Sequence, residues 1–211
     1  AIMAGRERLG LSRADLSIPE KQACAAIGQS FLMHTYEKAF EKKDIKVAQI
    51  LLSHDDLGNR RRYLNAKHTI EALLERNVIP IINENDSVTV EEIKIGDNDT
   101  LSATVACLVD AQLLIILSDV EGLFNRDPFI KIKGEKAELL SHVARVNDEI
   151  ERTAGKSNNR LTVGGMYTKV IAAKKTMSFG IPTLVVNGLD KKILEHVFSG
   201  KDVGTLFWSG K

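Results

Sequence analysis

The sequence has few cysteines and no long apolar run, and each of these absences excludes a class of protein. Cys24 and Cys107 are the two cysteines among 211 residues, which is too few for a disulfide framework. Neither lies in a Cys-x-x-Cys pair or a Cys/His cluster, as a structural metal site would need. We therefore expect two buried thiols in a reducing compartment. No apolar stretch approaches the roughly 20 residues that a membrane-spanning helix requires.

An excess of charge of either sign is also missing. Lys and Arg total 29 and Asp and Glu total 28, so the formal net charge is +1. This balance predicts neither nucleic acid nor a membrane surface as the main partner. The basic run at residues 60–62 lacks interleaved aromatic residues and indicates a solvated helix start, with a subunit contact as the alternative. The five histidines have no metal-ligand spacing, so we expect no metal ligands among them.

The first residues, Ala1 to Arg6, lack the basic-then-apolar order of a signal peptide. We therefore expect a cytoplasmic protein.

Short apolar runs alternate with helical patterns along the whole chain. Strands are predicted at 47–52, 78–82, 113–117, 181–186 and 205–208, and helices at 17–40, 61–76, 100–109, 146–154, 164–179 and 191–198, with a hairpin at 87–95 and a loop at 121–136. This alternation predicts an α/β fold with a mostly parallel sheet covered by helices on both faces. We expect one domain over residues 1–211. Ligands of such folds bind beyond the carboxyl ends of the strands.

Polar side chains gather at one such strand end. The segment 83–87, Asn-Glu-Asn-Asp-Ser, follows an apolar strand, and the segment 96–99, Gly-Asp-Asn-Asp, precedes a helix. An amino-acid ligand needs a carboxylate or carbonyl groups for its ammonium, and amide or cationic donors for its carboxylates. Asp86 and Asn98 could supply such a pair. The alternative is a polar surface loop rich in turn formers.

Two further segments could bind a nucleotide. Ser118 and Asp119 stand at the exit of the most apolar strand, although an ordinary turn is the alternative. Gly164 and Gly165 precede a predicted helix that carries Lys169 in its first turns. Paired glycines let the backbone approach a phosphate, and a helix start directs free N–H groups at it. The spacing matches neither a Walker loop nor GxGxxG, so a glycine loop with a solvated lysine is the alternative.

Taken together and in order, these segments resemble the amino acid kinase family and, within it, the glutamate 5-kinase branch. The asparagine-rich segment and the Gly-Asp-Asn-Asp segment separate this branch from uridylate, acetylglutamate and aspartate kinases. The resemblance covers nearly the whole chain and is carried by residues 63–66, 79–86, 95–103, 117–119, 122–124, 164–169 and 204–207.

The resemblance implies an open, mainly parallel sheet between helix layers. It also implies the ligands ATP, Mg²⁺ and L-glutamate, the product glutamyl 5-phosphate on the route to proline, proline as a feedback inhibitor, and a homo-oligomer (dimer or tetramer). The roles that it implies are glutamate binding by Asp86 and Asn98 with Asn83 and Asp97 nearby, catalysis by Lys169 oriented by Asp99, and nucleotide binding by Ser118, Asp119, Val163, Gly164, Gly165, Met166, Tyr167, Thr168 and Lys169.

The chain departs from the family pattern in two ways. It opens at Ala1-Ile2 inside the second glycine loop of the family, without the first strand, one catalytic lysine and a glutamate-binding serine, and it ends without an RNA-binding-type (PUA) domain. We therefore expect a fragment of a longer protein. Thr162-Val163 stands where the family has Gly-Thr, so Val163 offers no hydroxyl to a phosphate or ribose. Two alternatives stay open: another kinase of the family, or a non-catalytic module that binds glutamate or proline.

Overall fold

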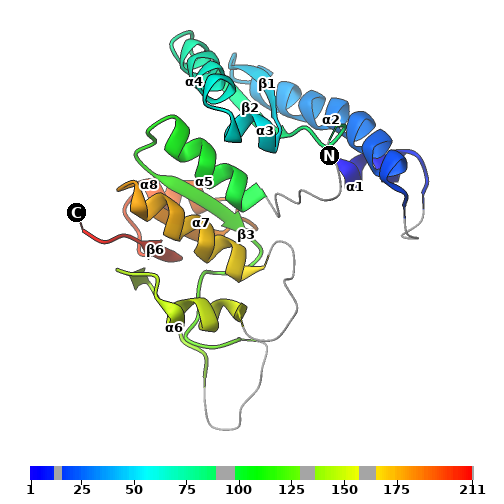
Figure 1. The fold of residues 1–211 in the computed structure, drawn as a ribbon. Coiled ribbons are helices and arrows are strands. Elements are labelled where there is room, and N and C mark those ends of the chain that lie inside the picture. The colour runs from blue at the N-terminus through cyan, green and yellow to red at the C-terminus, as the bar shows by residue number, and fades with distance from the viewer. Residues whose placement is uncertain (12–15, 89–97, 129–135, 157–164, 211) are drawn as a thin grey trace. The chain divides into compact units, whose positions relative to one another are not determined.

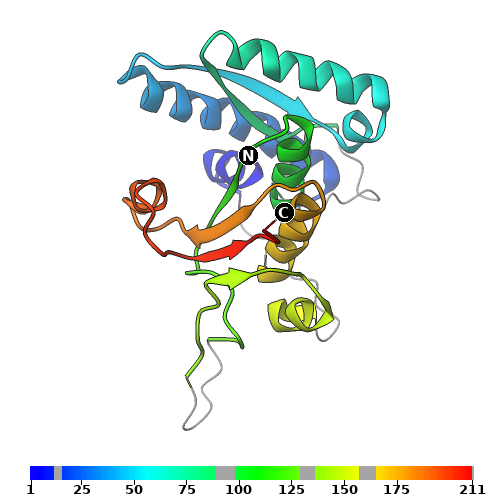
Figure 2. The ribbon, with the colours of Figure 1, turned by 90° about the vertical axis from the view of Figure 1, so that its left-hand side faces the viewer.

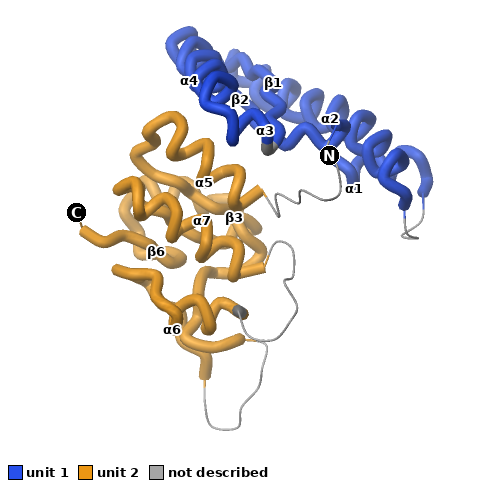
Figure 3. Tube along the Cα trace, viewed as in Figure 1, with its two compact units in different colours: residues 1–95 blue, residues 96–211 orange. Residues whose placement is uncertain are grey.

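A computed structural model describes residues 1–11, 16–88, 98–128, 136–156 and 165–210. The chain divides into two compact units, residues 1–95 and 96–211 (Figure 3). Each unit is described by itself. The predicted hairpin at 87–95 falls mostly outside the described residues, and the expectation of a single domain stays a prediction.

The first unit is built on two parallel strands with a long helix on either side. The strands pair in register from Lys46 with Val78 to Leu52 with Glu84. Helix α2 packs against β1 and α4 against β2, on opposite sides of the strand pair (Figures 1 and 2). The elements are α1(Ile2–Arg8), α2(Ile18–Glu41), β1(Lys46–Leu52), α3(His54–Gly58), α4(Arg60–Leu74) and β2(Val78–Glu84). The predictions for α2, β1, α4 and β2 are confirmed, whereas α1 and α3 were not predicted.

Helix α2 begins at a capping box. Glu20 accepts hydrogen bonds from the backbone nitrogen of Ser17 at 2.8 Å and from its hydroxyl at 2.6 Å. These bonds stabilise the charged carboxylate, so they hold the pKa of Glu20 below its usual value. Ser17 is therefore the N-cap residue of this helix.

The buried face of α2 holds several small residues rather than the large apolar residues of the helix. Ile27 and Phe31 are exposed, whereas the buried positions are Cys24, Ala25, Gly28, Gln29 and Met33. Small residues are buried because α1 packs closely against them. Similarly, α4 buries Ile70, while Leu64 and Leu74 are exposed.

Two glycines allow the close contact between α1 and α2. A methyl group at Gly5 would overlap the backbone carbonyl of Cys24, and one at Gly28 would overlap the carbonyl of Ala1. We expect Gly5→Ala to lower the free energy of unfolding by about 1–3 kcal/mol, because backbone cannot move aside as a flexible side chain can. Urea unfolding measures this. Gly58→Ala, where no atom lies within 4 Å of the added methyl group, is the control, and equal losses in both variants would contradict the prediction.

The second unit holds a four-stranded sheet. The strand order is β3-β5-β6-β4, in which β3 with β5 and β4 with β6 are parallel and β5 with β6 is antiparallel. Helices α5 and α7 pack together on one face of this sheet (Figure 2). The elements are α5(Asn98–Leu108), β3(Leu114–Ser118), β4(His142–Val143), α6(Asp148–Glu151), a π-helical turn η1(Arg152–Lys156), α7(Met166–Ser178), β5(Thr183–Asn187), α8(Ile193–Phe198) and β6(Thr205–Phe207).

The prediction of an α/β fold with a mainly parallel sheet is confirmed. The core of the second unit includes fully buried Phe207, Val170 and Val185. The hydroxyls of two buried threonines, Thr176 and Thr183, bond each other at 2.5 Å, which satisfies polar groups between α7 and β5.

Both cysteines are buried and unpaired, as predicted. Among the residues that the structure describes, no helix combines the length and apolarity needed to cross a bilayer.

Candidate active site

The start of helix α7 brings three predicted site residues together. Lys169 Nζ lies 3.0 Å from Asp99 Oδ2. The hydroxyl of Thr168 lies 2.8 Å from the same oxygen and 2.7 Å from the carbonyl oxygen of Gly165, the N-cap residue of α7. Asp99 comes from the first turn of α5, so the contact between α5 and α7 builds this cluster.

The pair is shielded from solvent. The side chains of Lys169 and Asp99 are 10% and 14% exposed. Charges interact more strongly in such a place than in water. Asp99 holds the ammonium of Lys169 at one position, and the start of α7 adds the positive end of the helix dipole. The arrangement is suited to binding a phosphoryl group that gains negative charge.

A cavity of about 780 Å³ adjoins this cluster. Ser118 and Asp119 line it from the end of β3, and Gly165, Met166 and Lys169 line it from the start of α7. Ser118 Oγ donates to Asp119 Oδ1 at 3.3 Å. The carboxyl end of β3 and the amino end of α7 therefore face one hollow, as expected for an α/β sheet. Its volume is in the range of small-molecule and cofactor sites.

Two further segments line this cavity and lie outside the residues named from the sequence as nucleotide contacts. Gly122 to Pro128 form one wall, in which Leu123 N donates to the hydroxyl of Thr205 on β6 at 2.8 Å. A methyl group at Gly122 would lie 2.5 Å from that hydroxyl, so a glycine is required for this close approach. The motif at 122–124 was a sequence signal for this wall.

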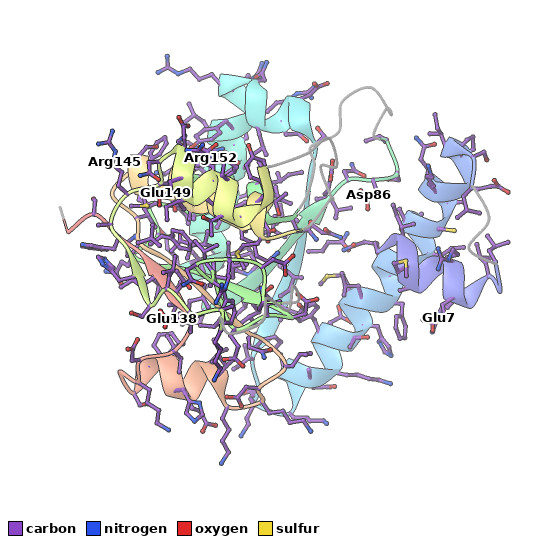
Figure 4. All side chains as sticks on the ribbon, turned by 90° about the horizontal axis from the view of Figure 1, so that it is seen from below. Glu7, Asp86, Glu138, Arg145, Glu149 and Arg152 are labelled. Atoms are coloured by element: carbon purple, nitrogen blue, oxygen red, sulfur yellow. The ribbon has the colours of Figure 1, made fainter. Side chains whose placement is uncertain are left out.

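The second wall runs from Arg152 to Gly155 in η1. Figure 4 labels Arg152 at the end of α6. Gly155 has a φ of 104°, a conformation that favours glycine. The sequence around it matches no motif, and a π-helical turn has no simple sequence pattern.

A smaller cavity of about 230 Å³ lies in the first unit, next to the end of β2. Asp86, labelled in Figure 4, lines it together with Gln29 and Gln49. Burial raises the pKa of the Asp86 carboxyl above its usual value. A cation in the cavity would offset this cost, so the carboxylate is suited to an ammonium group.

A chain of side-chain amides runs beside this cavity. Asn83 Nδ2 donates to Gln29 Oε1 at 2.9 Å, and Gln29 Nε2 donates to Gln49 Oε1 at 3.0 Å. The chain links β2, α2 and β1 and fixes the amide orientation of buried Gln29. Gln29 and Gln49 were not predicted, because glutamines in a helix and a strand have no distinctive spacing.

The remaining predicted residues are placed as follows. Asn98 is the first residue of α5, and it lies in a different unit from Asp86. Tyr167 is partly buried against the core of the second unit. Asp97, Val163 and Gly164 lie outside the described residues. Within the described ranges, no three His, Cys, Asp or Glu side chains gather as a metal-binding group.

Comparison with curated proteins shows strong similarity along the whole chain. The chain is 52% identical over 211 residues to "Glutamate 5-kinase" of Geobacter sulfurreducens, covering 56% of that protein. It is 52% identical over 207 residues to "Glutamate 5-kinase" of Clostridium tetani, covering 98% of this chain and 76% of that protein. The chain spans about half the length of the first of these relatives.

Solved structures and a family model agree on the fold. A UMP kinase from Bacillus anthracis superposes with a TM-score of 0.59 at 15% identity, covering 98% of this chain and 74% of the other. An isopentenyl phosphate kinase from T. acidophilum has a TM-score of 0.57 at 14% identity, covering 96% and 77%. The model described as "Amino acid kinase family" matches residues 3–187. The chain therefore belongs to the amino acid kinase family.

Proposed function

We propose that the protein to which this chain belongs transfers the γ-phosphoryl group of ATP to the side-chain carboxylate of L-glutamate. The product would be glutamyl 5-phosphate, the first intermediate of proline biosynthesis. The observation that carries the proposal of phosphoryl transfer is the shielded contact between Lys169 and Asp99 beside the 780 Å³ cavity. The choice of glutamate is supported by the 52% identity to two proteins named glutamate 5-kinase.

The proposed reaction needs little chemistry from side chains. A carboxylate is already a nucleophile, so no general base is required, and the main barrier is repulsion between two anions. Lys169 would neutralise charge that develops on the phosphoryl oxygens. Asp99 would keep the ammonium of Lys169 in place, and Thr168 would brace Asp99 from the same helix turn. The N–H groups at the start of α7 would donate to phosphate oxygens.

The large cavity fits a nucleotide. Ser118 and Asp119 would contact it at the end of β3, and Gly165 to Lys169 would border its phosphates. Val163 and Gly164 are proposed for the same role from the family resemblance. When bound with Mg²⁺, ATP would supply the phosphoryl group, and the metal would be held largely by phosphate oxygens, as is usual for Mg²⁺ in kinases.

The smaller cavity in the first unit is proposed to bind the amino-acid end of glutamate. Asp86 would accept from its ammonium group, and the neighbouring amides would donate to its α-carboxylate. Asn98, Asn83 and Asp97 are proposed as further glutamate contacts from the resemblance. Proline also carries an α-carboxylate and a cationic amine, which is a secondary ammonium, so it would compete there as a feedback inhibitor. A homo-oligomer and a cytoplasmic location remain predictions.

The direct test measures ADP release from MgATP by the full-length protein, with L-glutamate, L-aspartate, N-acetyl-L-glutamate and UMP as separate acceptors. We expect ADP release in the presence of L-glutamate and not with any of the other three acceptors. Release with another acceptor would make the protein a different kinase of the family. Calorimetric binding of glutamate or proline without ADP release would make it a binding module.

Gln29 offers a test of the glutamate subsite. Replacing it with methionine keeps the length of the side chain but leaves Asn83 and Gln49 without the amide that joins them. We expect the KM for glutamate to rise about tenfold, the effect of losing about 1.4 kcal/mol of hydrogen bonding, with the KM for ATP unchanged. Gln112→Met, at an exposed position, is the control. A rise in both KM values would contradict a role at the glutamate end.

A further inference from the structure

An ion pair joins helix α6, which directly precedes one wall of the large cavity, to helix α7. Lys174 Nζ lies 2.6 Å from Glu151 Oε1. Glu151 is 3% exposed, so its carboxylate is almost fully removed from solvent. The lysine is half-exposed and reaches in from the surface. A carboxylate with this burial needs such a partner.

Both partners sit directly beside elements of the proposed site. Glu151 is the last residue of α6, and the next residues, Arg152 to Gly155, form the η1 wall of the cavity. Lys174 lies on α7, the helix whose first turns carry Thr168 and Lys169. Helix α6 and η1 both contact α7. The ion pair thus fixes the cavity wall against the helix that presents the phosphoryl-binding lysine.

We propose that Glu151 and Lys174 are positioning residues for nucleotide binding: their ion pair holds the Arg152–Gly155 wall at the distance from α7 that a bound nucleotide requires. This inference rests on the proposed function only in naming ATP as the nucleotide. Neither residue is among those that line the cavity, so their effect on the nucleotide is exerted through the wall and the helix.

The wall is held by packing as well as by this ion pair, because buried Ala154 belongs to the hydrophobic core of the second unit. The η1 turn is a π-helical segment, and Gly155 within it adopts a positive φ. Single π-helical turns are rare and are found frequently at functional sites. Asn147 caps the start of α6 through Ile150 N at 3.0 Å, and the ion pair secures its other end. Without the ion pair, the exposed part of the wall at Arg152 would shift while Ala154 stays packed in the core.

The test compares Lys174→Met, Lys174→Arg and Lys191→Met in the full-length protein. Methionine keeps the length of the lysine without its charge, arginine restores the charge, and Lys191 is an exposed lysine of the same unit. For each variant, calorimetry gives the Kd for ATP, steady-state kinetics gives kcat and both KM values, and a thermal scan gives Tm. Assays are run well below the lowest Tm.

We expect Lys174→Met to raise the Kd and KM for ATP about tenfold and to leave the KM for glutamate within about twofold. Lys174→Arg is expected to recover most of the ATP affinity, and Lys191→Met to match the parent protein. A lower Tm for Lys174→Met with unchanged ATP affinity would overturn the proposal, because the pair would then serve stability alone. An equal loss for both substrates would also overturn it.

The binding measurement separates this inference from the proposed function. If the parent protein binds ATP but shows no glutamate-dependent ADP release, the proposed function fails. The tenfold change in the Kd for ATP would still support the positioning role. Conversely, normal turnover in the parent with no change in the Kd of Lys174→Met rejects the positioning role and leaves the proposed function intact.

Discussion

Replacing Lys169 with methionine is expected to lower kcat for glutamate phosphorylation by about 10²–10³-fold, the usual cost of losing one preorganised group that stabilises charge in the transition state. The side chain of Lys169 is 10% exposed and its Nζ is held 3.0 Å from Asp99 Oδ2, so its charge lies at a fixed position. The KM for glutamate is expected to change little, because the amino-acid end is proposed to bind elsewhere. Steady-state ADP release measures both constants.

The same substitution leaves the shielded charge of Asp99 without its lysine partner. A drop in Tm therefore has to be separated from the drop in kcat. The double variant Lys169→Met with Asp99→Asn removes both charges. We expect it to regain much of the Tm lost in the single variant and to remain as inactive, because stability and charge stabilisation have different origins. Recovery of kcat in the double variant would argue against a catalytic role for Lys169.

Replacing Asp86 with asparagine is expected to raise the KM for glutamate about 30- to 100-fold, the effect of losing a charged hydrogen bond to the substrate ammonium. The KM for ATP should not change. Asp202→Asn, at an exposed position, is the matched control. An unchanged KM for glutamate in Asp86→Asn would reject the proposed subsite.

We expect Asp86→Asn to weaken glutamate binding without lowering the free energy of unfolding. Burial raises the pKa of this carboxyl in the folded chain. The folded state therefore binds the proton more tightly than the unfolded state, and the charged form costs stability once the pH rises through the folded pKa. At neutral pH we expect Asp86→Asn to be at least as stable as the parent. The same shift predicts that glutamate binding weakens as the pH falls through the raised pKa, which a pH series of the KM for glutamate would detect.

The elements of the fold were largely predictable because the strands are short, apolar and separated by helices with clear starts. Residues 47–52 and 113–117 show this, and each matches a strand to within one residue at either end. Strand β4 and helix α3 were missed because they have two and five residues, too few for a periodic pattern.

The buried faces of the helices were less predictable than the helices themselves. Phe31 on α2 is exposed although it is a large apolar residue, whereas Gly28 and Ala25 are buried. Small residues are needed where two helix backbones pack closely. The spacing of apolar side chains does not reveal where this happens. The sequence pattern identifies an amphipathic helix more readily than it identifies the neighbour against which the helix packs.

Sequence motifs named both partners of one contact between distant segments, whereas residues outside any motif were missed. Lys169 and Asp99 were both named from the resemblance, and the structure places them in contact. The Gln29 and Gln49 amides and the η1 wall escaped prediction, because their roles come from tertiary contacts rather than from local spacing.

The contact between Asp99 and Lys169 also has a consequence for the order of folding. The two residues are 70 positions apart in the chain, and β3 likewise waits for β5 to pair along one edge. The ribosome must therefore synthesise the chain as far as α7 before the contact between Asp99 and Lys169 can form. Until then, helix α5 presents a carboxylate without its lysine and β3 an unpaired apolar edge. Such non-local contacts slow folding, and we expect the incomplete second unit to be prone to aggregation.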